Sequence, residues 1–150
     1  MSEFLNILKT LFLLIFFGNP ITLTPSPVDM EAGSRLVFNL EKSARVIGGA
    51  YLSIDVTSMR PDYVDSWEAA EAWDDEVFGE SRISATLINT STGEEAKVDH
   101  PSILSYNDTT SRLIVKKDGG LERGQTYNKI VVETDVELRG VTMTWNSWSM

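Results

Sequence analysis

The chain has 150 residues, of which 22 are acidic and 13 basic, so the formal net charge is −9, and cysteine is absent from it. A chain of this length has room for one domain with a single core, and the acidic balance argues against nucleic acid as a partner, because phosphate binding requires a basic surface. The lack of cysteine excludes a disulfide framework and a thiolate zinc site.

The first predicted element is an N-terminal hydrophobic helix. Lys9 precedes an unbroken apolar run over residues 11–17, and Gly18, Asn19 and Pro20 then interrupt it. A cation, a short apolar run and a turn in this order are typical of a secretory signal peptide. The run has no polar face, which argues against the alternative of a helix buried in a soluble core.

An uncleaved membrane anchor at residues 4–18 is a further alternative to a cleaved signal. This stretch is shorter than the roughly 20 apolar residues that a spanning helix needs. We therefore assign residues 1–24 to a signal peptide or membrane anchor, residues 25–34 to a linker and lead-in, and residues 35–150 to the folded domain. The expected location is periplasmic or otherwise extracytoplasmic, with membrane contact only through the N-terminal segment.

The folded domain is expected to be an all-β antiparallel sandwich of seven or eight strands. Apolar residues alternate with polar ones over short runs separated by turn residues, which is the pattern of half-buried strands. Turn signals every 8 to 15 residues are typical of a sandwich. The runs are residues 35–40, 50–58, 82–89, 96–98, 111–117, 126–138 and 140–145.

A short motif at the start of residues 126–138 resembles a corner of immunoglobulin-like and fibronectin type III sandwiches. Leu121, Gly124 and Tyr127 have the spacing Leu-x-x-Gly-x-x-Tyr. The resemblance implies that Leu121 fills the core and that Gly124 permits the turn. It also implies that Tyr127 enters the penultimate strand with its hydroxyl bonded to the corner backbone. By this resemblance the sandwich would be immunoglobulin-like, although the paired cysteines of antibody domains are missing.

The stretch DSWEAAEAWDDEVFGE at residues 65–80 predicts one short amphipathic helix, at about 65–78, inserted between strands. It has seven acidic and no basic residues. At about 100° per residue, its apolar residues gather on a little under half of the helix, together with Asp74. Asp65 is expected to cap the helix, with Glu68 completing a capping box. The residues expected in the apolar sector are Tyr63, Trp67, Ala70, Trp73, Val77 and Phe78.

The opposite side of this helix is the candidate binding surface. It consists of Glu68, Glu71, Asp75 and Glu76, and such carboxylates would suit a basic protein partner. A solvated face without a partner is the simpler alternative. A calcium site would require consecutive acids to converge, which a helix prevents because they point in different directions. Trp148, near the C-terminus, is a further candidate contact, since exposed tryptophan suits an interface or a sugar.

No catalytic residue, metal site or cofactor is predicted. The single histidine, His100, precedes Pro101 in an expected loop. A Ser-His-Asp arrangement would have to use it, and the adjacent Asp99 would point elsewhere if this segment were a strand. The leading hypothesis is an exported or membrane-tethered, non-enzymatic binding protein of the cell envelope, with a weak general resemblance to periplasmic immunity proteins. The alternatives are a structural or adhesive subunit of a surface assembly, and a small carbohydrate-binding module or hydrolase. An assembly subunit should have an unpaired edge strand, an inhibitor a protruding acidic element, and a hydrolase a pocket with converging carboxylates.

Overall fold

The fold is described from a computed structural model that covers residues 21–46, 49–79, 82–98, 103–106, 110–116 and 124–148, with the backbone alone described for residues 42, 49, 103–106 and 147–148. Within these residues the protein is mostly β, with one α-helix and one 3-10 helix. The elements are β1 (Ile21–Thr22), β2 (Val28–Met30), β3 (Arg35–Arg45), β4 (Gly49–Asp55), η1 (Thr57–Met59), α2 (Trp67–Phe78), β5 (Ile83–Ile88), β6 (Glu95–Val98), β7 (Ile103–Tyr106), β8 (Ser111–Val115), β9 (Thr126–Thr134) and β10 (Leu138–Trp148).

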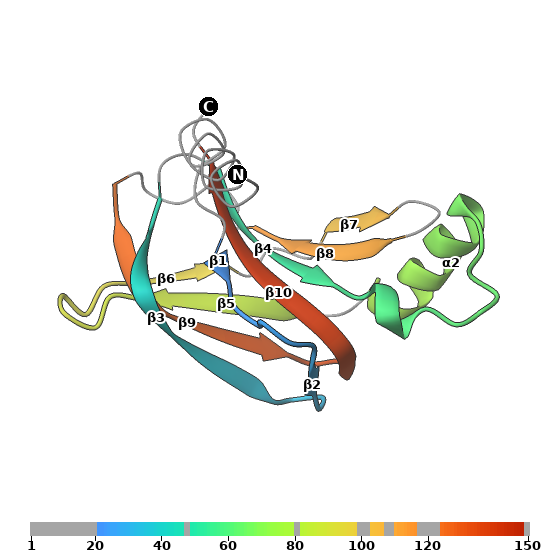
Figure 1. The fold of residues 1–150 in the computed structure, drawn as a ribbon, viewed down its shortest axis with the longest axis horizontal. Helices are drawn as coiled ribbons and strands as arrows, with labels where there is room; N and C mark the ends of the chain where they lie inside the picture. The colour runs from blue at the N-terminus through green and yellow to red at the C-terminus, as the bar shows by residue number, and fades with distance from the viewer. Residues whose placement is uncertain are drawn as a thin grey trace, which may run out of the picture.

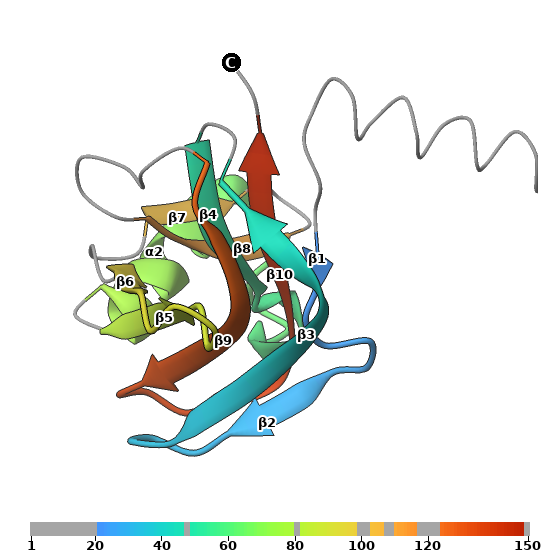
Figure 2. The same ribbon diagram turned by 90° about the vertical axis from the view of Figure 1, so that its left-hand side faces the viewer.

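The strands form two antiparallel sheets (Figure 1 and Figure 2). The larger sheet has the order β1-β10-β4-β8-β7, and β2 pairs with another part of β10. The smaller sheet has the order β3-β9-β5-β6. One hydrophobic cluster contains buried side chains from both sheets, so the core lies between them. The structure therefore confirms the expectation of an all-β fold of two packed antiparallel sheets.

The period-two pattern of the sequence predicts the core faces of the central strands correctly. Along Ile83–Ile88 of β5, buried and partly exposed residues alternate without interruption. In β10 the side chains of Val141, Met143 and Trp145 are buried, while the residues between them are partly exposed. Burying an apolar side chain of this size contributes roughly 1.5 to 3 kcal/mol, so these faces hold the two sheets together.

The described residues contain ten strands, more than the seven or eight expected. The run 126–138, expected as one long strand, is divided between β9 and β10 by a turn after Thr134. The Thr134 hydroxyl donates to the Val136 carbonyl at 2.9 Å and accepts from the Val136 amide at 3.2 Å. Threonine is a common strand residue, so its second role in closing a turn is not visible in the pattern.

The segment between residues 21 and 30 belongs to the larger sheet. Ile21 of β1 lies opposite Trp145 of β10, and the Thr24 hydroxyl accepts a hydrogen bond of 2.8 Å from the Met143 amide. Met30 of β2 is buried in the core. The structure thus places a strand within residues 25–34, the expected linker. It also places residues 21–24 against the sheet, before the expected end of the leading segment at residue 24.

Residues 1–20, with the predicted N-terminal helix, lie outside the described residues, so the assignment of a signal peptide or anchor stays a prediction. Leu121 and His100 also lie outside them. In the described part of the chain, no helix has the length and apolar character needed to cross a membrane.

Candidate functional site

The candidate site is built on α2, which lies between β4 and β5 in the sequence and beside β7 in the fold (Figure 1). Ser66 is the N-cap, because its backbone is extended and its hydroxyl accepts a hydrogen bond of 3.2 Å from the Ala69 amide. The expectation that Asp65 caps the helix with Glu68 was wrong by one position. Serine and aspartate are both good N-cap residues. Because Asp65 and Ser66 are adjacent, the backbone conformation before the helix decides which of them is the cap.

The buried side of α2 consists of Ala70, Trp73, Asp74 and Phe78. The rings of Trp73 and Phe78 meet edge to face, with centroids 5.6 Å apart and planes at 89°. Such a pair stabilises its packing by about 0.5 to 1.5 kcal/mol beyond the area it buries. The prediction that Trp73 is buried is confirmed, since its exposed fraction is 6%.

Three residues expected in the apolar sector of this helix are exposed instead. The exposed fractions are 64% for Tyr63, 54% for Trp67 and 36% for Val77. Tyr63 precedes the helix, so its helical angle does not apply to it. Trp67 and Val77 lie near the two ends of α2. Helical periodicity predicts the direction of a side chain but not how far the neighbouring surface extends.

The four candidate carboxylates are all on α2. Glu68, Asp75 and Glu76 are exposed as expected, whereas Glu71 is half-buried. The last turn of α2 contains no basic residue, and the sequence has none between Arg60 and Arg82. The exposed side of α2 therefore carries a concentrated negative charge with no neutralising residue on the helix itself.

A polar cluster fixes the buried side of α2 to β8. The Ser111 hydroxyl donates to the Asp74 carboxylate, with distances of 3.1 and 3.3 Å to its two oxygens. Arg60 donates through Nε to the same hydroxyl at 2.9 Å and through Nη2 to the Thr110 carbonyl at 2.8 Å. Burial raises the pKa of Asp74 above its usual 3.8, while the hydrogen bond from Ser111 and the charge of Arg60 act in the opposite direction.

Sequence reasoning placed Asp74 in the apolar sector but did not find its partners. A lone carboxylate among buried residues signals that a donor must be near, because an unpaired buried charge is costly. Ser111 and Arg60 are distant in sequence from Asp74, so only the fold identifies them as that donor and its neighbour. We assign the cluster a structural role, since all three groups are used to hold α2 in place.

The other predicted residues do not join this site. Trp148 ends β10 and its backbone lies opposite Gly49 of β4, and Figure 1 shows this end of β10 on another side of the molecule from α2. The side chain of Trp148 lies outside the described residues. At the corner, Gly124 has a φ of 84° and its amide donates to the Val46 carbonyl at 2.7 Å, while Tyr127 is buried.

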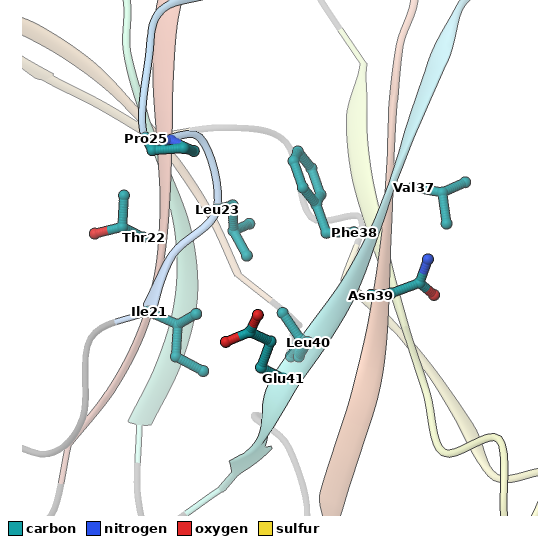
Figure 3. A pocket seen from close by; sticks show the side chains of 9 residues that line it. All are labelled: Ile21, Thr22, Leu23, Pro25, Val37, Phe38, Asn39, Leu40 and Glu41. Atoms are coloured by element: carbon teal, nitrogen blue, oxygen red, sulfur yellow. The ribbon is translucent and has the colours of Figure 1, made fainter.

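Two of the hollows lined by described residues bear on the hydrolase alternative. A groove of about 660 Å³ lies between the β1 region and β3 (Figure 3), and Glu41 is the only carboxylate among its described lining residues. A polar hollow of about 250 Å³ lies over β4, β8 and β10, with Asp55 as its single carboxylate and Arg112 directly opposite it. Neither hollow brings carboxylates together, and among the described residues no cluster of three metal-binding side chains forms.

Comparison with known proteins identifies no relative of this chain. No protein-family model, no curated protein and no solved structure matches the chain. The role of α2 must therefore be inferred from its own burial, charge and position.

Proposed function

We propose that this protein is a non-enzymatic binding protein that holds a basic protein partner on an exposed surface of α2. This α2 surface consists of Tyr63, Trp67, Glu68, Asp75 and Glu76. The observation that carries the proposal is that two large aromatic side chains, 64% and 54% exposed, stand at the start of a helix with exposed carboxylates and no basic residue.

The chemistry of these side chains suits a cationic partner. Tyrosine and tryptophan supply large contact areas at low cost in conformational entropy and are common in the centres of interfaces. Their ring faces attract the guanidinium of arginine and the ammonium of lysine. The surrounding carboxylates would pair with the same cations and would steer a basic partner during association.

The placement of charge on α2 supports a role outside folding. Asp75 and Glu76 lie in the last two turns, where the helix dipole presents its negative end and favours cations. Glu71 and Asp75 are also four residues apart, a spacing at which like charges repel on a helix. These carboxylates cost the helix some stability, which is consistent with a surface whose charge serves binding.

A binding role is preferred to the hydrolase alternative because of the shape of the described hollows. A glycosidase needs two carboxylates that flank its substrate, and each hollow has one in its described lining. The acidic element is the feature expected of an inhibitor. An immunity or inhibitor protein that blocks a basic enzyme or toxin is therefore our preferred form of the proposal.

The proposal includes an extracytoplasmic location, which rests on the order of Lys9, the apolar run at 11–17 and the following turn residues. It also includes an immunoglobulin-like scaffold. Gly124 with its positive φ and the buried Tyr127 are consistent with the resemblance at the corner. The topology departs from it at one point, because β9 and β10 belong to different sheets. In immunoglobulin domains the last two strands share a sheet.

The test uses charge reversal at the three exposed carboxylates of α2. The variant Glu68→Lys, Asp75→Lys and Glu76→Lys is immobilised beside the wild-type protein, and both are exposed to envelope extract from the source cells. A control variant, Glu31→Lys, Glu94→Lys and Glu95→Lys, makes the same change of charge at exposed positions away from α2. A basic protein that binds the wild type and the control but not the α2 variant would support the proposal.

Kinetics with the captured protein then test the mechanism. Electrostatic steering predicts that the α2 variant associates at least about tenfold more slowly at low salt, and that the difference shrinks at high salt. Trp67→Ala should mainly increase the dissociation rate, because an aromatic contact acts after encounter. Equal, salt-independent binding by all the variants would contradict the proposal.

A further inference from the structure

A second candidate site is the groove of about 660 Å³ between the β1 region and β3 (Figure 3). β1 is at one end of the strand order of the larger sheet, and β3 is at one end of the order of the smaller sheet. The groove therefore lies between two sheet edges. Its volume is within the range of small-molecule sites, which is roughly 300 to 1,000 Å³.

The walls of this groove are mainly apolar. Phe38 and Leu40 of β3 point toward Ile21 and Leu23 on the β1 side (Figure 3). Ile21, Phe38 and Leu40 are only partly buried, and they pack against the hydrophobic core. Apolar side chains that stay partly exposed in a hollow favour a ligand whose own apolar surface covers them, because this removes both surfaces from water.

A register shift in β3 turns one carboxylate into the groove. The pairing of β3 with β9 is regular as far as Asn39 and resumes at Ala44. Over this interval β3 advances by five residues and β9 by two, so the alternation of sides is interrupted. Figure 3 shows Glu41 on the same side of β3 as its neighbour Leu40. Bulge-like insertions of this kind change the direction of a side chain and are common beside functional sites.

The charge lies at one end of the groove. Figure 3 places Glu41 and Ile21 at this end, and Phe38 and Pro25 at the other. No basic residue is among the described residues that line the groove, and within the described part of the chain Glu41 forms no ion pair. The groove thus has a carboxylate that lacks a cation at one end and apolar walls beyond it.

We propose that this groove binds one molecule of an amphiphile that has an unbranched apolar chain and a cationic head. The chain lies between Phe38 and Leu23, and the ammonium of the head pairs with the Glu41 carboxylate. The single negative charge selects the sign of the head. A fatty acid would place its own carboxylate beside Glu41 and would be repelled.

A peptide strand fits this groove less well than an alkyl chain. Side chains stand roughly perpendicular to a sheet, whereas the peptide groups bond within its plane. The Leu23 amide, for example, donates to the Met143 carbonyl of β10 at 3.0 Å. A peptide held between the apolar side chains would bury its N–H and C=O groups without partners, which is costly. An alkyl chain has no such groups.

The groove and the α2 surface are separate. β1 and β7 are at opposite ends of the larger sheet, and α2 packs beside β7. An amphiphile in the groove would therefore leave the α2 surface free for a protein partner. Each of the two proposals can fail without the other.

The test measures binding of defined probes to the full chain by isothermal titration calorimetry, below the concentrations at which the probes form micelles. The probes are dodecyltrimethylammonium, its decyl and octyl homologues, and dodecanoate. The wild type should bind dodecyltrimethylammonium more tightly than dodecanoate. Each methylene removed from the chain should weaken binding about two- to fourfold, because that methylene is no longer buried.

Reversal of the groove charge tests the role of Glu41. In Glu41→Lys, the ratio of the affinity for dodecyltrimethylammonium to that for dodecanoate should fall at least about tenfold, since the substitution reverses the interaction with both heads. Glu95→Lys makes the same change of net charge in β6, at the other end of the same sheet, and should leave the ratio nearly unchanged. Both side chains are exposed, and thermal melting checks that each variant folds.

Two results would overturn the proposal. Probes that bind to the apolar run at residues 11–17 would respond to chain length but not to Glu41. An affinity ratio that Glu41→Lys and Glu95→Lys change equally would therefore exclude the groove as the site. The absence of saturable binding of dodecyltrimethylammonium to the wild type would show that the groove does not accept this class of ligand.

Discussion

The central strands and the helix α2 bury their apolar side chains in different ways. Trp145 lies in the middle of β10 with an exposed fraction of 1%, because the second sheet covers the strand along its length. In α2, Trp73 is 6% exposed while Trp67, less than two turns earlier, is 54% exposed. A helix at the side of a sandwich is covered only where the sheet reaches it. The start of α2 is therefore where a large apolar side chain, Trp67, meets solvent, whereas Phe78 at the other end is buried.

The largest expected effect separates these two tryptophans of α2. Trp73→Ala should reduce the free energy of unfolding by about 3 to 5 kcal/mol, because it removes a buried ring and its edge-to-face contact with Phe78. Trp67→Ala, on the same helix, should change it by about 0.5 kcal/mol, as an exposed position does. Chemical denaturation followed by circular dichroism measures both. Equal losses would show that α2 is covered along its whole length and would remove Trp67 from the candidate surface.

The next effect concerns the only charged group buried on α2. Asp74 has a raised pKa because of burial, so the folded protein binds its proton more tightly than the unfolded chain does. Its contribution to stability is thus fully present below the unfolded value near 3.8 and is lost as the pH rises through the raised, folded pKa. Asp74→Asn cannot titrate at this position. Relative to the variant, the wild type should therefore gain stability as the pH falls from 7 toward 4.

Denaturation of the two proteins at several pH values measures this difference directly. The exposed carboxylates are common to both proteins and cancel in the comparison. A difference that stays constant with pH would show that Ser111 and Arg60 offset the effect of burial on the Asp74 pKa. A difference that moves against the wild type on acidification would show that they outweigh it. Asp74 would then behave as a stabilised anion.

The sequence predicted a strand correctly where the whole inner face of that strand packs against the core. Alternation identified β5 and the core face of β10 because both strands are covered throughout. It missed β7 at Ile103–Tyr106, whose four residues are too few for a period to emerge. It also missed β1 and β2, because proline residues in residues 20–27 suggested a linker, although strands at a sheet edge tolerate nearby proline.

From the sequence, the helix of the candidate site and its exposed carboxylates could be predicted. The exposure of its aromatic side chains could not. Periodicity separated Glu68 and Asp75 from Trp73 correctly, since those positions face opposite sides of one helix. The exposure of Trp67 and the pairing of Asp74 with Ser111 depend on where β8 and the sheet end in space. Contacts between residues that are distant in sequence cannot be derived from local spacing. The position of β3 at one end of the smaller sheet's strand order is a consequence of the fold in the same way.

The smallest expected effect tests whether the charges of α2 serve folding at all. Glu76 is exposed near the C-terminal end of α2, where the helix dipole favours a cation, and the last turn has no basic residue. Glu76→Lys should therefore raise the free energy of unfolding by about 0.3 to 1 kcal/mol at low salt, with a smaller gain at high salt. Glu95→Lys, exposed in β6, is the control for the change in net charge. If Glu76→Lys instead destabilises the protein, the carboxylate has a structural partner. If it stabilises the fold while weakening capture of the basic partner, the acidic end of α2 costs the fold stability and contributes to binding.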